Sequence, residues 1–80
     1  MKLPVIKELA ESRSLEELIA AEEALTEGRN LPFHVAGEDE GEQLTHILGA
    51  RWIREEMQRT GCTLTEALRA YGRRVRESIS

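Results

Sequence analysis

The chain has little of what small proteins use for extra stability or for chemistry. It contains one cysteine, two histidines and three aromatic residues in 80. A single cysteine, Cys62, excludes an internal disulfide, and one cysteine with two scattered histidines is too few for a zinc motif. A chain of this length buries only roughly 60–65% of its unfolded surface, so a partner subunit is the remaining source of added stability.

Long apolar runs are also absent. None approaches the ~20 residues that a membrane-spanning helix needs, and the opening residues lead into a charged amphipathic stretch instead of the apolar core of a signal peptide. We therefore expect a cytoplasmic protein with no membrane segment. The length predicts a single helical domain over residues 1–80.

No group of residues has the spacing of a known catalytic or cofactor-binding motif. Cys62 has no histidine or carboxylate close in sequence to act as its base, and no serine, histidine and aspartate pattern suggests a triad. The chain cannot supply the paired acid, base and pocket residues of an active site. We predict a protein that is not an enzyme and that uses no cofactor.

The net charge of −4 is unevenly spread. Residues 1–40 carry four basic and ten acidic side chains, whereas residues 41–80 carry seven basic and five acidic ones. The overall acidity disfavours nucleic-acid binding, because that binding draws most of its affinity from neutralising phosphates.

Helix start and stop signals predict an all-α fold of about four helices. Pro4 suits the first position of a helix that ends near Arg13. Ser14 and Glu17 form a capping-box pattern, which predicts a second helix that ends at Gly28. The breaker-rich stretch that follows is a loop, and its alternating apolar pattern is compatible with a short extended segment near 31–36.

The second half of the chain predicts a long antiparallel helical hairpin. A helix from about residue 38 to 60 ends at Gly61, and Thr63 with Glu66 forms a capping box for the last helix. Gly49 and Gly72 lie twelve and eleven residues either side of Gly61. Because glycine costs roughly 1 kcal/mol inside a helix, their matching positions predict a close crossing of the two helices.

The third helix has apolar side chains on two sides, which is typical of a helix packed between two neighbours. The first two helices or another subunit would cover the second side, and the sequence does not decide between them. We take Trp52 as the anchor of a candidate interface. The full candidate interface is Trp52, Ile53, Met57 and Ala50.

Two groups of charged residues suggest binding functions other than protein interaction. Arg69, Arg73 and Arg76 form a basic ridge on the last helix that would bind a small anion or nucleic acid, although the ridge lacks aromatic residues for base stacking. A solvated helix face explains the same residues.

The other group lies at the start of the third helix. Asp39, Glu42 and His46 share a helix face and would hold a divalent ion. The plainer interpretation is that the carboxylates complement the helix dipole and that His46 lies on the surface.

Three segments resemble a family of short uncharacterised bacterial proteins, a domain of unknown function. They are the opening Met1–Lys7, the stretch Gly41–Ala50, and the ending that contains Glu66-Ala67-Leu68, Arg74-Val75 and Ser78-Ile79. The similarity covers the first seven residues and most of 38–79, and does not obviously include Glu11–Gly37. The resemblance implies a small cytoplasmic bacterial protein and carries over no active site, cofactor or partner.

The leading hypothesis is therefore a non-enzymatic interaction or oligomerisation module, either a homodimer or a partner of another protein. The alternative is a small-anion, nucleic-acid or metal-binding regulator that uses one of the two charged groups.

Overall fold

Four α-helices make up the fold. The computed structural model describes residues 1–79, and their side chains as far as residue 77. The helices are α1 (Leu3–Ser12), α2 (Leu15–Thr26), α3 (Glu40–Thr60) and α4 (Leu64–Ile79). The all-α prediction is confirmed, and within residues 1–79 the segment near 31–36 contains no strand.

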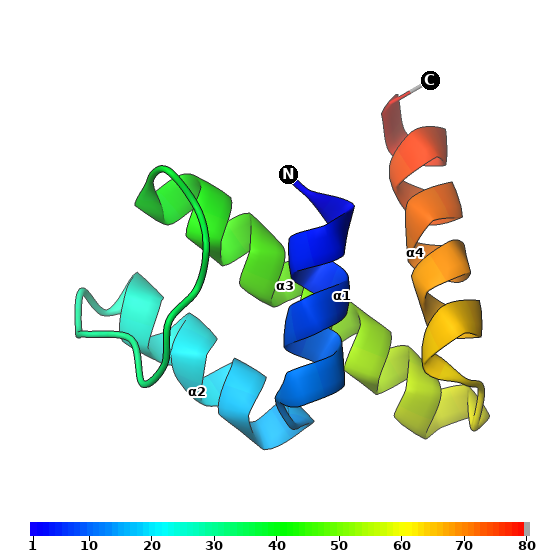
Figure 1. Ribbon diagram of the computed structural model, residues 1–80, viewed down its shortest axis with the longest axis horizontal. Helices are drawn as coiled ribbons and strands as arrows, with labels where there is room; N and C mark the ends of the chain where they lie inside the picture. The colour runs from blue at the N-terminus through cyan, green and yellow to red at the C-terminus, as the bar shows by residue number, and fades with distance from the viewer. Residues whose placement is uncertain (80) are drawn as a thin grey trace.

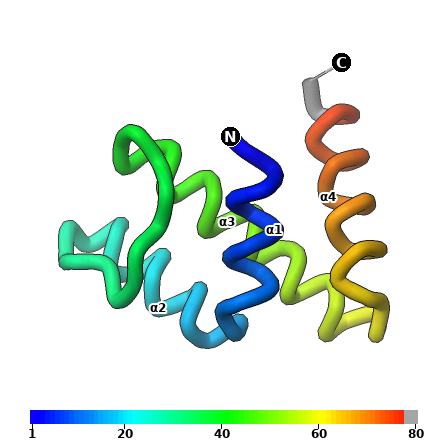
Figure 2. Tube along the Cα trace, viewed as in Figure 1, coloured from blue at the N-terminus to red at the C-terminus, as the bar shows by residue number. Residues whose placement is uncertain are grey.

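Helix α3 is the centre of the arrangement, since it contacts each of the other three helices. Figure 1 shows α1 crossing over the middle of α3, and α2 running beside α3 in the opposite direction. Helix α4 stands beside α1, and the tube in Figure 2 follows the same path. The Cα trace measures 32 × 28 × 18 Å, and its shortest dimension fits two layers of helices about 10 Å thick.

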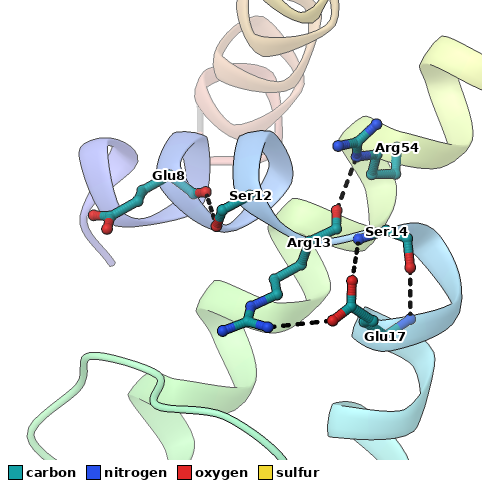
Figure 3. A network of polar contacts seen from close by, with 6 residues as sticks. All are labelled: Glu8, Ser12, Arg13, Ser14, Glu17 and Arg54. Atoms are coloured by element: carbon teal, nitrogen blue, oxygen red, sulfur yellow. Dashed lines mark hydrogen bonds and ion pairs between the residues drawn. The ribbon is translucent and has the colours of Figure 1, made fainter.

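The corner between α1 and α2 is held by a polar network (Figure 3). The Ser14 backbone N–H donates to Oε1 of Glu17 over 3.0 Å, and Oγ of Ser14 accepts from the Glu17 N–H over 3.2 Å. This reciprocal pair is the capping box that the sequence predicted. The Arg54 Nε–H on α3 donates to the carbonyl oxygen of Arg13 over 3.0 Å, so the corner is also tied to the central helix.

Removing the Ser14 hydroxyl should destabilise α2. We expect Ser14→Ala to lower the free energy of unfolding by about 0.5–2 kcal/mol, because the Glu17 N–H loses its partner at the helix start. Urea unfolding monitored by circular dichroism measures the change. Ser12→Ala is the control, since the Ser12 hydroxyl donates to the Glu8 carbonyl within α1 and caps no helix start; equal losses in the two variants would contradict the capping role.

The two capping boxes should also make stability depend on pH. The backbone N–H of Ser14 holds the pKa of Glu17 below its usual range, and that of Thr63 does the same for Glu66. A carboxyl with a lowered folded-state pKa stabilises the fold above its unfolded pKa, and this contribution is lost as pH falls through the folded pKa.

We therefore expect stability to fall below pH 4.5, the ordinary pKa of these carboxyls, and to fall less in the double variant Glu17→Gln/Glu66→Gln. Urea unfolding at several pH values compares the two proteins, with Glu11→Gln as an exposed control. The same acid dependence in the wild type and the double variant would overturn this expectation.

The turn between α3 and α4 forms as predicted, but the long hairpin does not follow from it. Gly61 ends α3 in the left-handed conformation, with φ 73°, and its N–H donates to the Met57 carbonyl over 2.8 Å. The Thr63 and Glu66 capping bonds then begin α4. The expected antiparallel pairing along both helices is not confirmed, since Figure 1 shows α3 and α4 diverging and α4 running beside α1.

The apolar side of α3 that carries Ala50 and Ile53 is covered within the chain, whereas Leu48 on its other apolar side is 45% exposed. Ala50 and Ile53, which the sequence placed in a candidate interface, are both fully buried. That part of the prediction is wrong, because neither side chain can reach another molecule unless the core opens. The core also contains Ile6 of α1, Leu18 of α2 and Ala67 of α4, so all four helices contribute to it.

Candidate functional site

Gly49 and Gly72, where the sequence predicted a close crossing of α3 and α4, have different surroundings. A Cβ added at Gly49 would lie 2.9 Å from Cδ1 of Ile6 and 2.9 Å from Oη of Tyr71. Gly49 is therefore the point where α1 and α4 side chains meet α3. A Cβ added at Gly72 would meet no atom within 4 Å, so no neighbouring helix requires a glycine there.

His46 lies in the interior instead of on the surface or in a metal site. It is fully buried, and it is the only polar residue so buried among those described. Its Nε2 accepts a hydrogen bond from the Lys2 backbone N–H over 3.0 Å, and Nδ1 lies 2.7 Å from the Ala36 carbonyl oxygen. Since Nε2 accepts, the proton is assigned to Nδ1, which donates to Ala36.

The metal interpretation of Asp39, Glu42 and His46 is therefore wrong. Both nitrogens of His46 are occupied, and Oδ1 of Asp39 accepts the Glu42 N–H over 2.8 Å as the cap of α3. Among residues 1–77, no group of three histidine, cysteine or acidic side chains is arranged to hold an ion.

His46 positions the N-terminal residues against the helices. The bond to Lys2 fixes the backbone between Met1 and Leu3, and Tyr71 Oη on α4 donates to Sδ of Met1 over 3.5 Å. Burial raises the pKa of the Tyr71 phenol above its ordinary value, so this hydroxyl stays protonated at neutral pH. The start of α1 is thus held beside α4.

Replacing His46 should loosen this start. We expect His46→Leu to lower the free energy of unfolding by about 1–3 kcal/mol, because the Lys2 N–H and the Ala36 carbonyl lose their partner. The Lys2 amide proton should also exchange faster with solvent, which NMR measures. The matched control is His34→Leu on the exposed loop; an unchanged Lys2 exchange rate in His46→Leu would contradict the positioning role.

A groove of about 570 Å³ lies between the start of α1 and α4. We call it the α1–α4 groove. Met1 and Leu3 line it on the α1 side, and they are 49% and 42% exposed. The only other exposed large hydrophobic residue among those described is Leu48. Two of these three exposed apolar side chains therefore border one groove.

Helix α4 supplies an apolar row and a basic row to this groove. The apolar row is Leu68, Gly72 and Val75, and the basic row is Arg69, Arg73 and Arg76. Each arginine follows one residue of the apolar row, so both rows repeat at four and three residues and run side by side along the helix.

The arginines of the basic row make none of the ion pairs found among residues 1–77. Those pairs use Arg13, Arg29, Arg51 and Arg59. The groove thus combines an apolar lining with guanidinium groups that are exposed to solvent. Such a surface suits a ligand that has apolar and anionic groups side by side.

Trp52 and Met57, the other members of the candidate interface, pack within the chain. Both are half-buried against the core. The Trp52 ring lies 5.6 Å from the Tyr71 ring, and the Arg74 guanidinium lies 5.8 Å from its centre, so Trp52 joins α3 to α4. A role for either residue at an interface stays a prediction.

A comparison with known protein families gives a match over the whole length of the chain. A model of a family of unknown function, DUF6952, matches residues 1–80. The chain belongs to this family. The match extends the similarity seen in the sequence to the segment between residues 11 and 37. No curated protein and no solved structure matches the chain.

The sequence predicted the basic row but not the apolar side chains of Met1 and Leu3 that lie across the groove from it. The ridge of Arg69, Arg73 and Arg76 shows in the helical period alone. Met1 and Leu3 join it only because the chain folds back over more than 60 residues. Leu3 begins α1, the shortest of the four helices, and Met1 precedes it; neither residue gives a local signal of what faces it. Within residues 1–79, every helix is too short or too polar to span a lipid bilayer.

Proposed function

We propose that the protein is a cytoplasmic, non-enzymatic interaction module that binds a partner protein through the α1–α4 groove. The observation that carries this proposal is that Met1 and Leu3 are exposed beside the half-buried apolar row of α4. Exposed apolar side chains that border a groove and are flanked by charge are typical of protein-binding surfaces. The half-buried thiol of Cys62 fits a reducing compartment.

A different protein is favoured over a second copy. A two-fold pair of chains joined at this groove would bring the same patch of each chain together. Arg69, Arg73 and Arg76 of one copy would then face those of the other, and like charges repel. We therefore expect a monomer of 9.1 kDa by light scattering at all protein concentrations.

Photo-cross-linking in cells tests the proposal. The cross-linking residue p-benzoylphenylalanine replaces Arg73 at the groove, or the exposed Glu23 on α2 as a control. We expect one discrete adduct from position 73 and none from position 23, with the partner peptide identified by mass spectrometry. The adduct should disappear when Leu3→Glu is added, because the charge disrupts the apolar side of the groove. Equal adducts from both positions, or none, would refute the proposal.

A second candidate function is the binding of a small anion by the basic row. It is favoured by the exposure of these arginines and by their absence from the ion pairs of residues 1–77. Titration with inorganic phosphate separates the two functions. If the basic row is an anion site, phosphate should bind to the wild type and to Leu3→Glu alike, and more weakly to Arg73→Gln. If the groove is a protein-binding surface, the binding of the partner protein should depend on Leu3 as well as on Arg73.

A further inference from the structure

The position of Gly72 in the α1–α4 groove is not explained by packing within the chain. An added Cβ would meet no atom within 4 Å, although glycine inside a helix costs roughly 1 kcal/mol relative to alanine. Gly72 lies midway along the apolar row, between Leu68 and Val75. The missing side chain leaves a notch between two larger ones, where a side chain of another molecule can approach the backbone.

The basic row lies parallel to this notch. Arg69 and Arg76 are seven residues apart, which is about 10.5 Å along the axis of α4. A second helix that carries acidic residues with helical spacing has carboxylates over the same length. Guanidinium groups bind carboxylates through two parallel hydrogen bonds, and this charge-assisted pairing is stronger than pairing of neutral groups.

From these two rows we infer that the α1–α4 groove binds an acidic amphipathic helix of another protein. An apolar side chain of that helix enters the notch at Gly72, and its carboxylates face Arg69, Arg73 and Arg76. Met1 and Leu3 cover the other edge of its apolar stripe. This is recognition of a helix in a groove, and it rests on the proposed function of the groove as a protein-binding surface.

Other ligands match the groove less well. Nucleic acid would need aromatic side chains on which bases stack, and none lines the groove. An anionic membrane would interact with the whole basic row but would gain nothing from a notch one residue wide. A helical peptide uses the charge and the notch together.

Binding of a designed peptide tests the inference. The probe is a helical peptide of about 18 residues with a leucine stripe and glutamates beside it at positions i, i+3 and i+7. The matched probe has glutamine at those three positions. Calorimetry measures the affinity of each probe for the wild type, Gly72→Leu and Arg73→Glu, with Arg29→Glu as a control that changes the net charge equally outside the groove.

We expect the glutamate peptide to bind at least tenfold more tightly than the glutamine peptide. Gly72→Leu and Arg73→Glu should each weaken the glutamate peptide at least tenfold, and Arg29→Glu should change it less than twofold. Circular dichroism should show that Gly72→Leu keeps the wild-type helicity, since the added side chain meets no neighbour. Equal binding of both peptides, or wild-type affinity in Gly72→Leu, would overturn the inference.

Competing ligands are measured alongside the peptides. Vesicles of phosphatidylglycerol and a single-stranded thymidine oligonucleotide are tested with the same variants. Binding of either one with an affinity above that of the glutamate peptide would overturn the inference in favour of that ligand. A concentration-dependent dimer that Gly72→Leu abolishes would overturn it in favour of a second copy.

The inference and the proposed function fail separately. If cross-linking from position 73 identifies a partner whose linked segment is not an acidic helix, the function stands and the inference is wrong. If no partner is linked at position 73 and neither peptide binds, both are wrong.

Discussion

Replacing Gly49 with leucine should strongly destabilise the protein, whereas the same change at Gly72 should not. At position 49 the first added carbon would already lie 2.9 Å from the side chains of Ile6 and Tyr71, and leucine adds three more carbons at a buried site. Overpacking of this kind costs typically 1–3 kcal/mol. At Gly72 the space is open, and the higher helix propensity of leucine favours the fold by up to about 1 kcal/mol.

Thermal and urea unfolding of the two variants check this contrast. For a chain of this size, a loss of 1 kcal/mol lowers the melting temperature by roughly 4–8 °C. We expect Gly49→Leu to melt well below the wild type and Gly72→Leu to melt at or above it. Equal destabilisation of the two variants would restore the crossing that the sequence suggested. Equal stability would mean that Gly49 does not lie at a close contact.

Truncating Ile53 should have the largest effect on stability of any change considered. Ile53 is fully buried in the core, and Ile→Ala at such sites costs about 2–5 kcal/mol. Because an 80-residue domain is stable by only about 4–12 kcal/mol, this is a large part of the total. Leu48 lies on the same helix and is 45% exposed, so Leu48→Ala should change the stability by no more than about 0.5 kcal/mol.

The comparison of Ile53 and Leu48 separates a core residue from an interface residue. Urea unfolding measures the stability of each variant, and light scattering measures its mass. An Ile53→Ala variant that unfolds like the wild type but has a lower mass would show that Ile53 holds two chains together. The full burial of Ile53, in a core to which all four helices contribute, predicts the opposite result.

Local signals in the sequence predicted the helix boundaries well. The capping boxes at Ser14 and Thr63 begin α2 and α4, and Gly61 ends α3, because each depends on groups within four residues of one another. The two-sided α3 was also recognisable from its period. The sequence left open whether α1 and α2 or another subunit cover the second apolar side of α3, because this depends on how the helices pack.

The site could be predicted only in part, because its contacts join distant residues. His46 looked like a surface or metal-binding residue, yet its partners Lys2 and Ala36 lie 44 and 10 residues away. Gly72 was paired with Gly49 in a predicted helix crossing, because the sequence shows where a glycine is but not which atoms face it. The basic row was recognisable, whereas Met1 and Leu3 join it only in the folded chain.

A charge-swap experiment tests the groove most directly. The double variant Arg73→Glu/Arg76→Glu and the wild type are each titrated with the glutamate peptide and with the same peptide carrying lysine at the three positions. We expect the wild type to prefer the glutamate peptide and the double variant to prefer the lysine peptide, because the apolar contacts stay and only the paired charges change sign. The same preference in both proteins would mean that the peptide binds elsewhere, and it would contradict the assignment of the α1–α4 groove as the binding surface.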